Sequence, residues 1–520
     1  MMRLTSAIAC AGLLAGTLAV APPAHAAPTR YEAETAPAVC EGSIDNDHTG
    51  YSGSGFCNGD NSTGAYAQFT VNAGAAGTAT LGIRHANGTT SGRPAGLIVN
   101  GTTLQTLPFA ATGAWTSWTT TTLTVPLNAG SNTIRLDPTT SNGLPNIDYV
   151  EVDAGGTTQP PADTLYVAPG GGDGAAGTES DPTTLTSAIS RVAPGGTIYM
   201  RGGTYRHAQT VTIAPGDDGL PGDRTELFAY PGETPVLNFS AQSEDSANRG
   251  LAVGGSYWHI RGIVVERAGD NGILLAGHNN VIERTVTRFN RDSGLQLSRL
   301  VAGAPADQWP SGNLVVSSVS HDNADSDGED ADGFAPKLTV GPGNVFRYTV
   351  SHNNIDDGYD LYTKDDTGPI GAVTIEDSLA YGNGTLSDGS QAGDGDRNGY
   401  KLGGEDIGVN HVVRRNIAYE NGKHGFTYNR NLGRMTVSDN VGIGNEERNF
   451  NFDGGSSVFR GNTSCDSGSN DRIIGDADGS NQFWSGSNGS RCSAYGGSLS
   501  WSFASDGRLV VTFGGRRLTP

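Results

Sequence analysis

Gly358-Tyr-Asp-Leu361 is one of six copies of a pattern in which glycine is followed by a bulky residue, a variable residue and an apolar residue. The other copies are Gly272-Ile-Leu-Leu275, Gly294-Leu-Gln-Leu297, Gly333-Phe-Ala-Pro336, Gly399-Tyr-Lys-Leu402 and Gly425-Phe-Thr-Tyr428. A second strand-like pattern alternates with the first, as in Asn280-Val-Ile-Glu283 and His411-Val-Val-Arg414. Each repeat therefore contains at least two strands.

The repeats are about 22 to 40 residues long and carry insertions of unequal length. This favours a parallel β-helix, in which each coil buries its apolar side chains against its neighbours. Asparagine-rich turns precede several of the repeated glycines, as at Asn271, Asn354 and Asn398, and leucine-rich repeats lack such turns. Propeller blades need four strands per unit. A short helix over residues 183–192, followed by a strand over 196–200, is expected to cover the N-terminal end of the solenoid.

Aligning the glycines places equivalent residues in columns with a rise of about 4.8 Å per coil. Asp332 and Asp357 then lie one above the other, Asp356 precedes Asp357, and Asp360 neighbours Lys401. Clustered carboxylates repel one another unless a cation is present, and oxygen ligands in this number suit Ca²⁺. The sequence predicts a calcium site made by Asp332, Asp356, Asp357 and Asp360, with a solvated acidic turn as the alternative.

A lysine beside calcium fits the cleavage of a 4-linked uronide by elimination. The C5 proton of such a sugar is weakly acidic because it lies next to a carboxylate, and a cation on that carboxylate stabilises the transition state. We predict Lys401 as the base, its pKa lowered by desolvation and Ca²⁺; the alternative is an ion pair with Asp360. Arg397, in the column of Asp356, is a candidate for binding a second substrate carboxylate. Further candidates are Lys337, Lys364 and Arg430.

The chain before the repeats reads as a separate module. From Tyr31 to about Val152, short runs such as residues 65–71 and 132–136 alternate apolar and polar residues, which is typical of a β-sandwich. A Gly- and Pro-containing stretch follows and reads as a linker. We therefore expect an all-β protein with a signal peptide over 1–26, a β-sandwich module over 27–153, a linker over 154–163 and a right-handed parallel β-helix over 164–520.

The start of the chain and the cysteines point to export. Arg3, the apolar residues 7–21 and Ala24-His-Ala26 resemble a secretory signal, so a secreted, extracellular protein that starts at Ala27 is expected. The remaining cysteines form two close pairs, Cys40 with Cys57 and Cys465 with Cys492, which read as disulfides or as free thiols. The net charge of −21 argues against nucleic acid, no later apolar run predicts a membrane span, and nothing indicates an oligomer.

The solenoid resembles polysaccharide lyase family nine, the pectate lyases with a ten-coil parallel β-helix. The matching stretches are Ala331-Asp-Gly-Phe-Ala-Pro-Lys-Leu-Thr339, Gly343-Asn-Val-Phe346, Asn354-Ile-Asp-Asp-Gly-Tyr-Asp-Leu-Tyr362 and Asn398-Gly-Tyr-Lys-Leu-Gly-Gly404. The resemblance covers about residues 165–451 and is poor after Phe452. It implies a calcium-dependent lyase acting on polygalacturonate or another pectic polysaccharide, with Ca²⁺ on the four aspartates and Lys401 as base.

The N-terminal module is similar to carbohydrate-binding modules of families six and thirty-five. Tyr31-Glu-Ala-Glu34, Trp115-Thr-Ser-Trp118 and Asn146-Ile-Asp-Tyr-Val-Glu-Val152 carry this likeness. It implies a structural Ca²⁺ on Glu32, Glu34 and Asp148. Tyr51, Arg93 and Asn142 are candidates for sugar contact, and ordinary loop roles are their alternative.

Other functions remain open at this point. A polygalacturonase hydrolyses with an acid and a base and needs no calcium, so the lysine beside clustered aspartates disfavours it. A rhamnogalacturonan lyase shares scaffold and chemistry, and alginate is a possible substrate on the same logic. A non-catalytic binding protein accounts for the β-helix and the sugar module but not for Lys401 beside Asp360.

Overall fold

The computed structural model describes residues 29–73, 77–128, 130–153, 162–391 and 395–517. The chain divides into two compact units between Thr158 and Gln159. The predicted signal peptide and most of the predicted linker lie outside the described residues. Within the described ranges, no helix has the length and apolar character required to cross a membrane.

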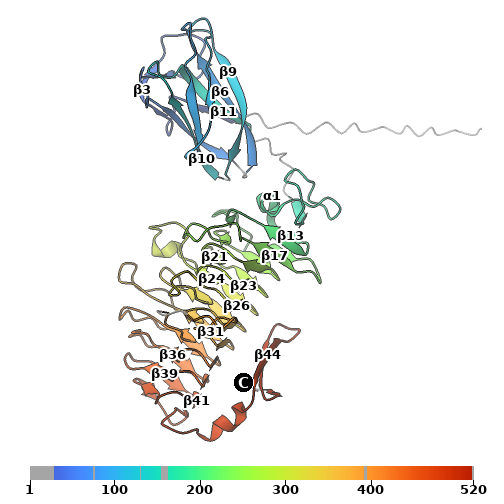
Figure 1. Cartoon of the computed structure of the whole chain (residues 1–520), viewed down its shortest axis with the longest axis vertical. Helices are drawn as coiled ribbons and strands as arrows, with labels where there is room; N and C mark the ends of the chain where they lie inside the picture. The colour runs from blue at the N-terminus through green and yellow to red at the C-terminus, as the bar shows by residue number, and fades with distance from the viewer. Residues whose placement is uncertain (1–28, 74–76, 129, 154–161, 392–394, 518–520) are drawn as a thin grey trace, which may run out of the picture. The chain divides into compact units, whose positions relative to one another are not determined.

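The N-terminal unit is a sandwich of two antiparallel sheets (Figure 1). One sheet contains β3 (Gly42–Asp45), β4 (Phe56–Gly59), β11 (Asn146–Asp153), β6 (Gly77–Ala86) and β9 (Thr119–Leu127), with β1 (Thr29–Glu32) also paired to β11. The other contains β2 (Val39–Cys40), β5 (Ala67–Ala73), β10 (Gly130–Pro138), β7 (Ala95–Val99) and β8 (Thr102–Leu107). The alternating runs predicted at residues 65–71 and 132–136 pair with each other as β5 and β10, which confirms the sandwich.

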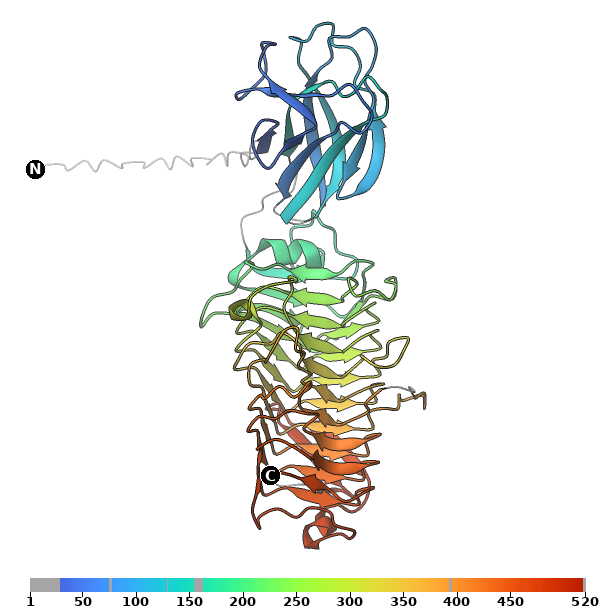
Figure 2. The same ribbon diagram turned by 90° about the vertical axis from the view of Figure 1, so that its left-hand side faces the viewer.

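The second unit is a parallel β-helix whose coils stack along one axis (Figure 2). Its first sheet contains β12 (Ala162–Val167), β13 (Val192–Met200), β16 (Thr225–Ala229), β19 (Trp258–Arg261), β22 (Val281–Glu283), β25 (Leu314–Val316), β28 (Val345–Arg347), β31 (Thr374–Glu376), β34 (Val412–Arg414), β37 (Thr436–Ser438), β40 (Val458–Arg460) and β43 (Asp476–Ala477). Its second sheet contains β14 (Gly203–Arg206), β17 (Pro235–Asn238), β20 (Val264–Glu266), β23 (Val286–Arg288), β26 (Val319–His321), β29 (Val350–His352), β32 (Leu379–Tyr381), β35 (Ile417–Tyr419), β38 (Val441–Ile443) and β41 (Thr463–Cys465). Its third sheet contains β15 (Val211–Ile213), β18 (Leu251–Val253), β21 (Ile273–Leu275), β24 (Leu295–Leu297), β27 (Phe334–Pro336), β30 (Tyr359–Asp360), β33 (Tyr400–Lys401), β36 (His424–Thr427), β39 (Arg448–Phe452) and β42 (Arg472–Ile473).

The two repeated patterns of the sequence occupy two of these three sheets. The glycine pattern begins the strands of the third sheet from β21 to β36. The second repeated pattern, of the type Asn280-Val-Ile-Glu283, forms the strands of the first sheet from β22 to β37. The second sheet had no separate prediction. The all-β fold class and the parallel β-helix are confirmed.

Ladders of buried side chains hold the coils together. The asparagines at 290, 323, 354, 383, 421, 445 and 449 form a chain in which each Nδ2 donates to the next Oδ1 over 2.7–3.0 Å. Aromatic rings stack beneath the third sheet, from Phe334 and Tyr359 through Tyr400 to Phe426, with centroids 5.3, 4.6 and 4.6 Å apart. These ladders fix the positions of β27, β30, β33 and β36 relative to one another along the axis of the β-helix.

Replacing Asn383 with alanine is expected to lower the free energy of unfolding of the β-helix by about 2–4 kcal/mol, since it removes the Oδ1 that accepts from the buried N and Nδ2 of Asn354 and the Nδ2 that donates to the buried Oδ1 of Asn421. Asn470→Ala is the matched control, because that residue is exposed, and it is expected to change stability by no more than about 0.5 kcal/mol. Urea denaturation of the full chain measures both. Equal midpoints for the two variants would show that the ladder contributes no stability.

The N-terminal end of the β-helix is covered as predicted. Helix α1 (Leu185–Arg191) begins after Thr184, whose Oγ1 accepts a hydrogen bond from Ser187 N at 3.2 Å. Its buried face includes Leu185 and Ile189 within the core of the solenoid. Strand β12 precedes the predicted first strand and begins at residue 162, inside the predicted linker.

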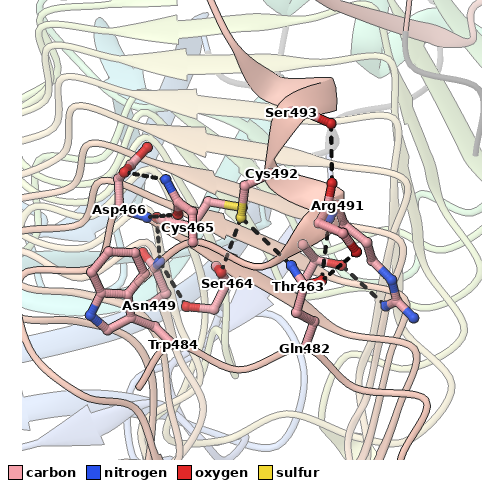
Figure 3. Close-up of a disulfide and its surroundings, with 12 residues drawn as sticks. Asn449, Thr463, Ser464, Cys465, Asp466, Gln482, Trp484, Arg491, Cys492 and Ser493 are labelled. Carbon is pink, nitrogen blue, oxygen red and sulfur yellow. Dashed lines mark hydrogen bonds between the residues drawn. A yellow bond between two sulfur atoms is a disulfide. The ribbon is translucent and has the colours of Figure 1, made fainter. Parts of the chain in front are cut away.

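The chain after the last coil folds back along the solenoid. A short 3₁₀ helix, η2 (Ser490–Tyr495), carries Cys492, which forms a disulfide with Cys465 of β41 (Figure 3). Strands β44 (Leu499–Phe503), β45 (Leu509–Phe513) and β46 (Arg516–Arg517) then form an antiparallel sheet that packs on the second sheet, where Trp501 Nε1 donates to Tyr381 Oη at 3.1 Å. The second predicted disulfide, Cys40 with Cys57, is also present. Another 3₁₀ helix, η1 (Ala306–Gln308), lies in a loop between coils.

Candidate active site

The predicted acidic residues come together at the third sheet. Phe334 is in register with Tyr359, and Gly333 N donates to the carbonyl oxygen of Asp357 at 3.0 Å. Asp332 and Asp357, each one residue before its glycine, therefore lie on adjacent coils. Asp360 is in register with Lys401 on the next strand. The columns inferred from the glycine pattern are thus the columns of the fold.

Three carboxylates converge closely enough to share one ion. Asp332, Asp357 and Asp360 each offer an oxygen, and these oxygens lie within 4.8 Å of one another. All three side chains are buried. No second group of this kind occurs among the residues that the structure describes. The fourth predicted ligand, Asp356, is buried nearby, but its Oδ1 accepts hydrogen bonds from the backbone N–H groups of Asp396 and Arg397.

The donor set fits a hard divalent cation. Asp360 Oδ1 is buried and accepts no hydrogen bond from the described residues. A buried carboxylate oxygen without a partner is costly, and Ca²⁺ takes such oxygens in flexible geometry. The clustered residues contribute carboxylates without a cysteine or histidine, which argues against Zn²⁺.

Two lysines flank the acidic cluster. Lys401 Nζ lies 3.2 Å from Asp357 Oδ2, 3.7 Å from Asp360 Oδ2 and 3.1 Å from Asp396 Oδ2. Lys337 Nζ lies 2.7 Å from Asp332 Oδ2 and 3.5 Å from Asp360 Oδ2. Each side chain is about nine-tenths buried. The two lysines thus partly balance carboxylates that have little access to water.

Burial and neighbouring charges together raise the pKa values of three aspartates and of Lys401 in this cluster. Burial raises the pKa of Asp357 to about 6, although Lys401 opposes the shift. Burial also raises the pKa values of Asp332 and Asp356 well above the ordinary range. For Lys401, burial favours the neutral form, but the nearby aspartates outweigh it and raise its pKa. The lowering of this pKa expected from the sequence therefore requires positive charge on the same carboxylates.

The site contains residues that the sequence analysis did not single out. Asp396 binds both Lys401 and Lys423, with its Oδ1 2.8 Å from Lys423 Nζ. Two features of the sequence pointed to Lys423. Lys423 stands two residues before Gly425, in the same column as Asp356 and Arg397. The chain also has only four lysines, at 337, 364, 401 and 423, and three of them contact this acidic group.

Arg397 adopts a left-handed backbone conformation with φ of 56°. Its side chain is half-buried, and its Nε donates no hydrogen bond to the described residues. Its place beside Asp356 is as predicted, and its binding of a substrate carboxylate stays a prediction.

The predicted calcium ligands of the N-terminal module surround one turn. Ser52 Oγ donates to Glu32 Oε2 at 2.6 Å, and Ser54 N donates to Glu34 Oε1 at 2.7 Å. Asp148 accepts from Ser52 N at 2.9 Å and pairs with Arg84 at 2.8 Å. Glu34 Oε2 is buried without a hydrogen-bond partner, which fits a cation here. This second calcium site stays a prediction.

The predicted sugar contacts of the module are not gathered into one group by direct contacts. Arg93 donates to Asn61 Oδ1 at 2.9 Å and to the carbonyl oxygen of Leu144 at 2.8 Å, so it ties loops together. Tyr51 packs against Phe56 with centroids 5.6 Å apart, and Asn142 is exposed. Their role in sugar binding stays a prediction.

Comparison with known proteins matches both units. Residues 165–470 match the model of the Pel9A-like, right handed beta helix region, and residues 32–154 match that of the carbohydrate binding module family 6. Pectate lyase L of Paenibacillus polymyxa is 48% identical over 352 residues, covering 66% of this chain and 78% of the relative. The crystal structure of pectate lyase Pel9A superposes with a TM-score of 0.56 at 31% identity, covering 64% of this chain and 83% of that one. A family 35 module, CBM35 from Cellvibrio japonicus Abf62, is 42% identical, with a TM-score of 0.24 and coverage of 24% of this chain and 92% of that module.

Proposed function

We propose that this chain is a calcium-dependent pectate lyase that cleaves polygalacturonate by β-elimination. The chain belongs to the Pel9A-like right-handed β-helix family and is a polysaccharide lyase. The observation that carries the proposal is Lys401 in register with Asp360, beside Asp357 and Asp332, in a family whose relatives include pectate lyases. No hydrolytic acid and base pair is needed for this arrangement to act on a uronide.

Asp332, Asp356, Asp357 and Asp360 would hold Ca²⁺ at this site. A bound calcium ion would neutralise the carboxylate of the sugar and stabilise the negative charge that develops when its C5 proton leaves. The aspartates also keep the lysine in place, since Asp357 and Asp360 approach Lys401 Nζ to 3.2 and 3.7 Å.

Lys401 in its neutral form takes the C5 proton. The electron pair of the C5–H bond forms the C4–C5 double bond, and the glycosidic oxygen leaves C4 with its electrons and is protonated by solvent. The neutral form is accessible once positive charge on the aspartates offsets their effect on the lysine pKa. The product is a 4,5-unsaturated galacturonide.

The protein is proposed to act outside the cell as a monomer. The disulfides Cys40–Cys57 and Cys465–Cys492 suit an oxidising compartment. The N-terminal module would bind pectic polysaccharide and keep the lyase near its substrate, which fits its match to a carbohydrate-binding family.

Substrate choice tests the proposal. The full chain is expected to release unsaturated product from polygalacturonate at least tenfold faster than from rhamnogalacturonan, whose backbone lacks a carboxylate on every second sugar, or from alginate, whose uronates differ from galacturonate in ring configuration. Ultraviolet absorbance of the double bond measures each rate in the same buffer. Faster cleavage of rhamnogalacturonan would assign that backbone instead, and the absence of product from all three polymers would favour a binding role.

A further inference from the structure

A hollow of about 290 Å³ lies next to Lys401 on its C-terminal side. Thr427 of β36 is in register with Lys401, and Asn451 of β39 is in register with Thr427. Both line the hollow. A polymer lying along the column of Lys401 would therefore place its neighbouring residue over this space, because adjacent strands are about 4.8 Å apart.

Lys423 provides a cationic group in the hollow. Its Nζ donates one hydrogen bond among the described residues, to Asp396 Oδ1 at 2.8 Å. An ammonium group has three donors, so two remain for a ligand. Asp396 also contacts Lys401 at 3.1 Å, so a single carboxylate separates the heads of the two lysines.

The acids that line the hollow already have partners of opposite charge. Asp453 pairs with Arg472 at 2.9 Å, and Asp396 pairs with both lysines. Their repulsion of an incoming carboxylate is therefore reduced, while the side chain of Lys423 is about one-third exposed and reachable.

Two further lining residues have buried polar atoms without hydrogen-bond partners. These atoms are His424 Nδ1 and Asn451 Oδ1. The side chain of His424 is more than nine-tenths buried, and burial lowers its pKa to about 4, so its ring is neutral and offers one donor and one acceptor. Unpaired buried polar atoms are rare in folded proteins and indicate a ligand or water at the site. Hydroxyl groups of a sugar match both atoms.

From these observations we propose that the hollow is a binding subsite for a second uronate residue of the substrate, with Lys423 holding its carboxylate and His424 and Asn451 contacting its hydroxyls. This assignment rests on the proposed action on a uronate polymer. Lys423 is a specificity residue here, because it contacts a sugar adjacent to the one that loses its proton.

Kinetics of Lys423→Met provide the first test. Loss of one charge-assisted hydrogen bond is expected to raise KM on polygalacturonate by about tenfold while kcat changes less than about threefold. Lys423→Arg retains the charge and is expected to recover part of the loss. Arg434→Met is the matched control, since it removes one positive charge at an exposed position that does not line the hollow, and its KM is expected to equal that of the unsubstituted enzyme.

Binding separates this inference from the proposed activity. In the Lys401→Ala background with Ca²⁺ present, calorimetry with a saturated oligogalacturonate is expected to show affinity about tenfold weaker when Lys423→Met is added. Equal affinity and unchanged KM for the Lys423→Met proteins would overturn the subsite. If the unsubstituted enzyme releases no unsaturated product, the elimination proposal is wrong, and the calorimetric comparison still decides the subsite.

Discussion

Replacing Lys401 with alanine is expected to lower kcat on polygalacturonate by about 10²–10⁴-fold, because the group that removes the C5 proton is lost. The substitution leaves the fold in place, since the aromatic stack and the asparagine ladder hold β33 independently of the lysine head. Absorbance of the unsaturated product gives kcat, and circular dichroism checks the fold. Arg434→Ala is the control, because Arg434 is exposed, carries the same charge and lies outside the acidic cluster.

Lys401→Arg separates a base from a structural cation. Arginine keeps the positive charge near Asp357 and Asp360, but its guanidinium cannot be deprotonated in a protein. If Lys401 is the base, the arginine variant is as inactive as the alanine variant. Near-normal activity of Lys401→Arg would show instead that the residue serves as an ion pair.

Asp360→Asn is expected to raise the calcium concentration needed for half-maximal activity by roughly 10- to 100-fold, because calcium affinity depends strongly on the number of charged ligands. Asp360 is the informative choice, since its Oδ1 has no hydrogen-bond partner and its amide analogue keeps the shape of the side chain. Titration of activity with Ca²⁺ measures the shift, and calorimetry measures calcium affinity directly.

Asp377→Asn, elsewhere in the same β-helix, is the control for Asp360→Asn. Asp377→Asn changes the same charge at a half-buried ion pair with Arg415, outside the cluster. Its calcium requirement is expected to match that of the unsubstituted enzyme. An unchanged calcium titration for Asp360→Asn would remove this residue from the ligand set.

The site could be predicted from the sequence because its residues keep a fixed offset from a repeated glycine. Gly358 and Gly399 begin equivalent strands, so the alignment of Asp360 with Lys401 followed from counting residues, and their register in the fold is the same. The same fixed offset predicted that Asp332 and Asp357 lie on adjacent coils, as they do in the fold.

The strands of the second sheet could not be distinguished in the sequence from those of the first sheet, because most of them follow a strand of the first sheet after only two residues. The bend between them uses a single left-handed residue, such as Arg284 with φ of 50°, Ser317 with 51° and Arg415 with 55°. Side chains in that conformation are uncommon, and glycine or asparagine is the usual sign of it. Without that sign, each pair of strands reads as one continuous run.

The C-terminal sheet had no repeat to reveal it. Its apolar residues, among them Trp501 and Phe513, pack on the second sheet through contacts between segments far apart in the chain. Asp396 was missed for a similar reason, since it reaches Lys401 and Lys423 from a loop outside the glycine offsets that were compared.

The measurement that tests the calcium-dependent elimination most directly is the rate at which the purified full chain produces ultraviolet-absorbing product from polygalacturonate, first with Ca²⁺, then with a chelator, then with Ca²⁺ restored. The arrangement of Asp332, Asp357, Asp360 and Lys401 predicts a rise in absorbance that stops with chelator and returns with Ca²⁺. New reducing ends without absorbance would indicate hydrolysis, and a rate that ignores the chelator would contradict a calcium-dependent elimination.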